Sequence, residues 1–124
     1  MLTHSLHWFF PVFRGMGFGL VAMVFHEAGH ILCALALGLR VKKVGVGWKG
    51  MFTVRDPGLP KENLLISLAG PMVNLALLAF WHWQPTFGLA NLCTGLVNLL
   101  PIQGSDGSRI LRCWRMMKET GNRD

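Results

Sequence analysis

Residues 15–39 read GMGFGLVAMVFHEAGHILCALALGL, an apolar run whose only acidic, basic or imidazole side chains are His26, Glu27 and His30. A helix needs about 20 residues, with roughly 17 to 25 tolerated, to cross the hydrocarbon core of a bilayer. A surface helix of a soluble protein would also carry a polar face wide enough to meet water, and this run carries none. The stretch therefore predicts a membrane-spanning helix.

Two more apolar runs follow, at residues 64–83 and 86–102, and the second is only marginally long enough to span. The composition agrees, because 52% of the 124 residues are hydrophobic and only 15% are charged. We expect one membrane-embedded domain over residues 1–124, in an all-α integral-membrane fold with three transmembrane helices at about 15–39, 64–83 and 86–102. A soluble all-α bundle is the alternative.

The chain between and after these runs has a different character. Residues 41–54 alternate apolar residues with polar residues or glycine, which predicts a short β-hairpin between the first two spans. Residues 109–118 place apolar side chains at helical spacing against three arginines. This pattern predicts a C-terminal amphipathic helix on the inner membrane surface, attracted to anionic lipid.

Lysines and arginines gather in the connection after the first run and in the C-terminal tail, and the net charge is +6. Under the positive-inside rule both segments lie in the cytoplasm. We therefore expect a protein of a bacterial-type cell membrane, with its N-terminus outside and its C-terminus cytoplasmic. The basic residues are Arg40, Lys42, Lys43, Lys49, Arg55 and Lys61 in the connection, Arg109, Arg112, Arg115, Lys118 and Arg123 in the tail, and Arg14 on the other side.

Aromatic residues support this orientation by marking the expected outer interface. They are Trp8, Phe9, Phe10, Phe13, Trp81 and Trp83. The basic residues do not form a stripe with interleaved aromatics, so we expect the lipid bilayer as a partner and no nucleic acid. The start of the chain lacks a basic segment and a clear cleavage site, and we expect the mature chain to begin near Met1.

The three cysteines, Cys33, Cys93 and Cys113, are odd in number and lack C-x-x-C spacing. We expect all three to be small buried packing residues.

The first run contains His26-Glu27-Ala28-Gly29-His30, an H-E-x-x-H motif. Positions i and i+4 of a helix face the same way, so both imidazoles can bind one zinc while the glutamate reaches a zinc-bound water and takes its proton. Ionisable residues in the middle of a membrane helix cost on the order of 2.5 to 3.5 kcal/mol each on insertion scales, and such residues mark functional sites. The alternative is that neighbouring helices satisfy three structural polar residues.

A catalytic zinc site usually takes three protein ligands, and Asp106 is the acidic residue that follows the third run. Pro101 and two nearby glycines would let the chain turn and direct this carboxylate at the metal. Two alternatives stay open. Asp106 could be the N-cap of a helix beginning near Ser108, and Cys33 could be the third ligand.

Taken together, the motifs resemble those of the site-2 protease family of intramembrane zinc metalloproteases. The resemblance rests on the H-E-x-x-H motif, on the segment Ala69-Gly70-Pro71-Met72-Val73-Asn74 and on residues 98–107, in this order over nearly the whole chain. It implies that His26, His30 and Asp106 bind one zinc ion per chain and that Glu27 is the general base. The implied reaction is hydrolysis of a peptide bond in a membrane-spanning protein substrate.

The resemblance also implies that Asn74 and Asn98 position the substrate or stabilise the oxyanion, whereas an interhelical hydrogen bond is the alternative for each. The hairpin resembles the family's membrane-associated β element, whose edge could take an unwound substrate strand. The chain has Gly104, Ser105, Asp106, Gly107 and Ser108 where the family commonly has proline, leucine, aspartate and two glycines. This departure puts the rigidity of the turn in doubt.

We expect a minimal member of the family that lacks appended recognition domains. A homo-oligomer and an accessory membrane protein are both left open as further partners. The alternative function is a catalytically impaired zinc-binding membrane module that binds transmembrane partners. Metal transport is weaker, because three short helices offer one ion site and no second set of relay carboxylates.

Overall fold

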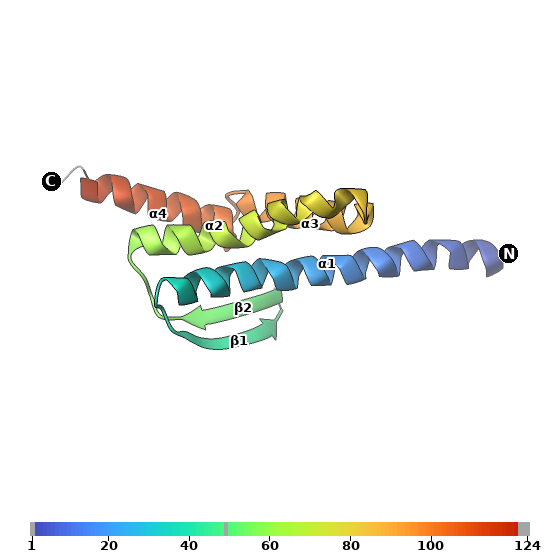
Figure 1. The fold of residues 1–124 in the computed structure, drawn as a ribbon, viewed down its shortest axis with the longest axis horizontal. Coiled ribbons are helices and arrows are strands. Elements are labelled where there is room, and N and C mark those ends of the chain that lie inside the picture. The colour runs from blue at the N-terminus through green and yellow to red at the C-terminus, as the bar shows by residue number, and fades with distance from the viewer. Residues whose placement is uncertain (1, 49, 122–124) are drawn as a thin grey trace.

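The structure is a computed structural model and describes residues 2–48 and 50–121. It is mostly helical, with an antiparallel hairpin between the first two helices (Figure 1). The elements in chain order are helix α1 (Leu2–Ala36), strands β1 (Val41–Gly47) and β2 (Gly50–Arg55), helix α2 (Pro60–Ala76), the 3₁₀ helix η1 (Leu77–His82), and helices α3 (Pro85–Leu99) and α4 (Asp106–Gly121).

Helix α1 runs along one side of α2 and α3 and packs against both, while its N-terminal turns project past them (Figure 1). The contact with α2 is close at Gly29, where a Cβ atom would overlap the carbonyl oxygen of Ala69 and the side chain of Val73. Small residues at such contacts let two helix backbones approach, as is common in membrane helix packing. This contact places the C-terminal part of α1 directly against α2.

Two helical segments, Phe9–Ala36 and Pro60–His82, are long and apolar enough to cross a membrane by length and composition. Only 28% of each apolar window is buried within the structure, unlike the mostly buried core helix of a soluble protein. Helix α3 has 15 residues, which is shorter than the roughly 20 needed to span. The three-span arrangement therefore stays a prediction.

The hairpin has the expected position and packs on α1. Val44 pairs with Thr53 and Val46 with Met51, and the register shifts between Val41 and Lys43. Along β2, Met51, Thr53 and Arg55 are half-buried, whereas Phe52 and Val54 are exposed. The first three residues therefore form the inner face of β2.

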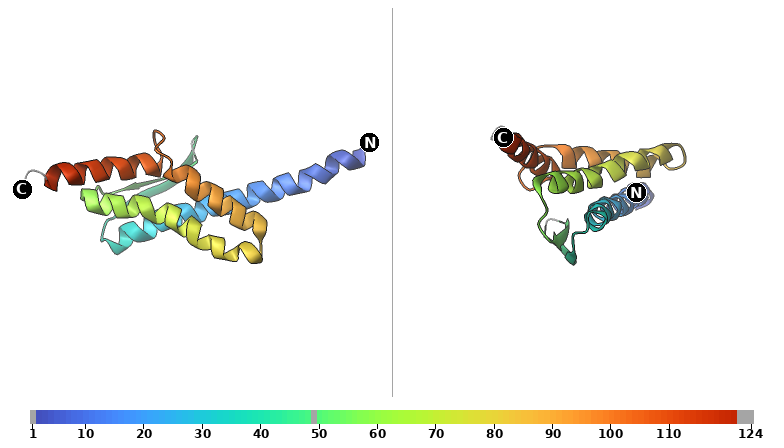
Figure 2. Two further views of the ribbon diagram at one scale, coloured as in Figure 1. Left: turned by 90° about the horizontal axis from the view of Figure 1, so that it is seen from above. Right: turned by 60° about the vertical axis from the view of Figure 1, so that its left-hand side comes forward.

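Helix α4 packs mainly against α2, and the turned views show it beside the start of that helix (Figure 2). Its buried residues are Asp106, Gly107 and Cys113. A Cβ atom at Gly107 would overlap the carbonyl oxygens of Leu99 and Leu100, so α4 begins in contact with the end of α3. The hairpin and α4 lie toward one end of the molecule and the N-terminus at the other (Figure 1).

The expected interface aromatics are exposed where the structure describes them, and the Trp8 side chain lies outside the described residues. The exposed ones are Phe9, Phe10, Phe13, Trp81 and Trp83. All three cysteines are free. Cys113 is buried as expected and Cys33 is half-buried, but Cys93 is exposed, so its expected burial is wrong.

Candidate metal centre

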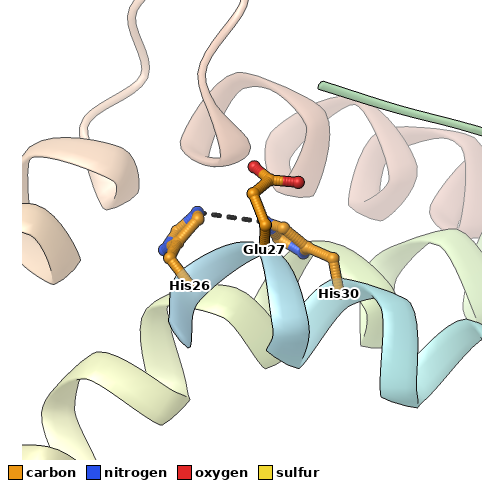
Figure 3. Close-up of side chains that lie close together, drawn as sticks. All are labelled: His26, Glu27 and His30. Atoms are coloured by element: carbon orange, nitrogen blue, oxygen red, sulfur yellow. Dashed lines mark hydrogen bonds between the residues drawn. The ribbon is translucent and has the colours of Figure 1, made fainter. Parts of the chain in front are cut away.

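Helix α1 brings the two motif histidines together. His26 and His30 lie one turn apart, both are buried, and their Nε2 atoms are 3.0 Å apart (Figure 3). Glu27 projects from the same side of the helix, and one donor atom from each of the three residues lies within 4.8 Å of the others (Figure 3). The expected convergence of these side chains on one helix face is therefore present.

Asp106 reaches the histidines from the first residue of α4. Its Oδ2 atom lies 2.7 Å from Nε2 of His26 and 3.2 Å from Nε2 of His30. Ligands bound to one tetrahedral zinc at 2.0–2.2 Å are separated by about 3.3–3.6 Å, slightly more than the distances in this triangle. The three atoms therefore form a triangle close to the size that a zinc ion requires. Cys33 takes no part in these contacts.

The outer ring nitrogens of both histidines face hydrogen-bond acceptors. Nδ1 of His26 donates to Oδ1 of Asn74 at 2.7 Å, and Nδ1 of His30 donates to the carbonyl oxygen of Ile66 at 2.6 Å. These partners fix the proton of each neutral imidazole on Nδ1 and leave a lone pair on Nε2.

The three atoms that form the triangle therefore all carry a lone pair and can all bind a cation. Two Nε2 lone pairs and the Asp106 carboxylate face one another at 2.7 to 3.2 Å. Such an arrangement is repulsive unless a cation lies between the atoms, either a metal ion or a proton on one imidazole. The set of two imidazoles and one carboxylate therefore fits a divalent metal, and its ligand types suit zinc.

Asn74 lies behind His26 and does not line the cavity. It is fully buried, and its amide nitrogen donates to the carbonyl oxygen of Ala22 and to Oδ1 of Asn91. Asn91 is also fully buried and donates to the carbonyl oxygen of Phe87. The structure thus places Asn74 in a polar network that orients a histidine, which is the interhelical hydrogen bonding given as the alternative, and its substrate role stays a prediction.

Asn98 has a different environment, because its side chain lines the cavity in front of the histidines. Its amide nitrogen donates to the carbonyl oxygen of Thr94 at 2.8 Å. The cavity has a volume of about 330 Å³. Its walls come from α1, β2, α2, the end of α3 and the start of α4. Asn98 therefore borders the cavity beside the donor triangle, and its role toward a substrate stays a prediction.

Ser105 is the residue that caps α4. Its hydroxyl accepts a hydrogen bond from the backbone N–H of Ser108 and contacts the carbonyl oxygens of Leu100 and Ile102. Asp106 is therefore the first helical residue and not the N-cap, so its carboxylate is free to face the histidines. Burial raises the pKa of Asp106, whereas the contacts with His26 and His30 lower it. The second effect is the larger, so the pKa of Asp106 lies below its ordinary value.

Gly70, in the middle of α2, makes room for the donor triangle. A Cβ atom at this position would overlap the imidazole of His30 and crowd Nε2 of His26. The glycine of the Ala69-Gly70-Pro71 segment is therefore required by the side chains opposite it.

Sequence reasoning did not identify several residues of the site. Thr53 donates to Glu27 at 3.1 Å, Asn91 supports Asn74, and Arg55 and Arg109 line the cavity. Only Asn91 left a signal that could have been used, because it is a polar residue inside an apolar run.

No protein-family model matches the chain. The chain is similar to a zinc metalloprotease of Methanocaldococcus jannaschii, with 35% identity over 74% of the chain and 31% of that protein. It is also similar to a Synechocystis sp. protein provisionally named a zinc metalloprotease, with 29% identity over 83% of the chain and 31% of that protein. The chain thus spans about a third of the length of the curated relatives that it matches.

Proposed function

We propose that this chain is an intramembrane zinc metalloendopeptidase of the site-2 protease type. The observation that carries the proposal is the convergence of His26, His30 and Asp106 into a triangle of electron-pair donors, with Glu27 beside it. The two relatives named zinc metalloproteases support the zinc and the protease chemistry. The low burial of the two apolar helices supports a lipid environment.

In this proposal His26, His30 and Asp106 hold the zinc ion, which when bound acts as a Lewis acid and lowers the pKa of water toward about 7. Glu27 lies next to the triangle and removes a proton from the attacking water. It then delivers the proton to the amide nitrogen as the peptide C–N bond breaks. Asn74 and the carbonyl oxygen of Ile66 keep the imidazoles oriented throughout the reaction.

The substrate in this proposal is a membrane-spanning protein whose helix is locally unwound. The inner face of β2 lines the cavity, and in the described two-stranded sheet β2 pairs with β1 alone. Its other edge is therefore available to an extended peptide, and main-chain hydrogen bonds would hold the peptide next to Glu27. Asn98 would contact the bound peptide from the opposite wall.

We also propose that the chain is embedded with its N-terminus outside and its C-terminus in the cytoplasm. In this arrangement the hairpin and α4, which carry most of the basic residues, lie at the cytoplasmic end. The carboxylate of Asp106 contacts both histidines although the turn at residues 104–108 departs from the family pattern. This favours the enzyme over an impaired binding module.

The test combines metal content with cleavage. Detergent-purified wild-type protein should contain close to one zinc ion per chain by mass spectrometry, and His26→Ala and Asp106→Ala should lose most of it. Glu27→Gln should keep the zinc and lose cleavage of a membrane-spanning substrate. Equal cleavage by Glu27→Gln and wild type would refute the mechanism, and zinc-free wild type from a chelator-free preparation would refute the site.

A further inference from the structure

One hydrogen bond joins the hairpin to the motif helix. The hydroxyl of Thr53, in the middle of β2, donates to Oε2 of Glu27 at 3.1 Å. Thr53 pairs with Val44 on β1, and its side chain belongs to the half-buried inner face of β2. Among the hydrogen bonds of residues 2–48 and 50–121, this is the one that connects the hairpin directly with α1.

The alternation of β2 makes this contact specific to one strand position. Successive side chains of a strand point to opposite faces, so Met51, Thr53 and Arg55 share the half-buried face of β2, whereas Phe52 and Val54 are exposed and Phe52 only borders the cavity. Of the three inward residues, Met51 offers no strong donor and Arg55 donates to the Asp56 carbonyl oxygen and to Asn63. Thr53 is therefore the inward residue whose hydroxyl is available to the carboxylate.

Glu27 needs such a partner, because its side chain has several rotatable bonds and lies in a cavity. Thr53 provides the one side-chain hydrogen bond that Glu27 accepts within the described part of the chain, and that part contains no ion pair to Glu27. With Oε2 held, Oε1 keeps its capacity to accept a proton. A base must be held within hydrogen-bond reach of the proton that it removes, and small misplacements slow catalysis strongly.

We propose that Thr53 is a positioning residue for the base Glu27, and that its hydroxyl makes the hairpin part of the catalytic apparatus as well as a substrate-binding edge. The inference rests on the proposed function of Glu27. It assigns β2 two separable tasks: the strand edge binds substrate, and the Thr53 hydroxyl sets the geometry of the base. Loss of the first task raises KM, whereas loss of the second lowers kcat.

The test uses three variants of the full chain. Thr53→Val keeps the shape and strand preference of the residue but removes the donor, Thr53→Ser keeps the donor, and Val54→Ala changes an exposed residue on the other face of β2. The probe is a single-span peptide with a fluorophore and a quencher near its cytoplasmic end, chosen from a panel because wild type cuts it. Zinc content is measured for every variant.

We expect Thr53→Val to lower kcat by roughly tenfold or more, as for loss of a hydrogen bond to a charged group, with little change in KM and full zinc content. Thr53→Ser should recover most of the kcat, and Val54→Ala should behave like wild type. A Thr53→Val variant with wild-type kcat, a raised KM instead of a lowered kcat, or no recovery in Thr53→Ser would overturn the assignment.

A second measurement does not depend on turnover. The melting temperature of Thr53→Val should fall in the wild-type background and change much less in a Glu27→Ala background, because the hydroxyl then has no carboxylate to hold. Equal decreases in both backgrounds would overturn the assignment. If Glu27→Gln cleaves like wild type, the proposed function itself fails, which is distinguishable from a failure confined to Thr53.

Discussion

At Gly70 the missing side chain is what allows His26 and His30 to meet. A Cβ atom there would overlap one imidazole and crowd the other, and helix backbone cannot move aside as easily as a flexible side chain. We expect Gly70→Ala to weaken zinc binding by more than about tenfold, as for other disturbances of ligand orientation. Competition with a zinc chelator would measure the affinity.

Gly19 provides the matched control for this prediction. It also lies inside a helix, but nothing lies within 4 Å of where its Cβ atom would be. Gly19→Ala should retain wild-type zinc affinity and should stabilise α1 by about 0.5–1 kcal/mol. Full zinc affinity in Gly70→Ala would show that the imidazoles are not confined as described.

We expect alanine substitutions of Asn74 and Asn98 to affect zinc binding differently. Asn74→Ala removes the acceptor of His26 Nδ1 and leaves Asn91 without one of its partners. We expect zinc affinity to fall by about 10- to 100-fold. Asn98→Ala should keep its zinc and lower cleavage instead. Unchanged zinc affinity in Asn74→Ala, combined with slower cleavage, would return Asn74 to the substrate role that its motif implies.

At the level of single residues, the sequence predicts what is local and misses what is set by packing. The spacing of His26 and His30 places both on one helix face whatever surrounds the helix. The partner of a buried amide depends on how two helices rotate against each other, and this made the position of Asn74 unpredictable. Thr53 was missed for the same reason, because an alternating strand does not indicate which side chain of another element each of its residues will contact.

Among the elements, the turn between α3 and α4 depends on Ser105. Its hydroxyl contacts two carbonyl oxygens and accepts a hydrogen bond from the N–H of Ser108, so it stabilises the conformation of the turn. We expect Ser105→Ala to destabilise the protein by about 1 kcal/mol through the lost cap and to weaken zinc binding by releasing Asp106. Thermal unfolding and chelator competition would measure the two effects.

Thr120→Ala is the control for the turn, because Thr120 also lies on α4 and bonds only the carbonyl oxygen of Met116 among its described neighbours. It should change neither quantity appreciably. If Ser105→Ala matched wild type in melting temperature and zinc affinity, the Ser105 hydroxyl would neither stabilise the turn nor help to place Asp106.

The expected helices differ from the observed ones mainly at their ends. Hydropathy predicted a first span at residues 15–39, whereas α1 ends at Ala36 and is followed by Gly38 with φ of 80°. This left-handed glycine is a common helix terminator and was readable from the sequence. Helix α3 likewise ends at Leu99, just before Pro101, although the apolar run continues to Ile102. An apolar run indicates that a segment lies in an apolar environment, whereas capping residues and prolines determine where its helix ends.

For the whole molecule, the orientation in the membrane can be tested by labelling. In a variant with the three native cysteines replaced by alanine, His7→Cys and Glu119→Cys each place one thiol at an exposed position near one end of the chain. We expect a membrane-impermeant maleimide to label position 7 from outside intact cells and position 119 only after the cells are opened. The opposite pattern would reverse the orientation, and labelling of both positions from outside would contradict an odd number of spans.

The sequence alone did not predict which helices and strands pack against one another. Three apolar runs do not determine that α4 packs on α2 or that the hairpin lies against α1, since each contact depends on side chains that are distant along the chain. The motif order nevertheless predicted that Asp106 lies near His26 and His30, and its carboxylate lies 2.7 and 3.2 Å from their side chains in the structure, while the shared metal stays a prediction. Chemistry therefore predicted one long-range contact that hydropathy could not.

The shortness of α3 has a consequence for the surrounding lipid. Its 15 residues rise about 22 Å, whereas the hydrocarbon core of a typical bilayer is about 30 Å thick. In the proposed arrangement this hydrophobic mismatch would draw the two leaflets together around α3 and bring headgroups and water closer to the end of the helix where Asn98 and Asp106 lie. In that case, thinner bilayers would give water easier access to the donor triangle.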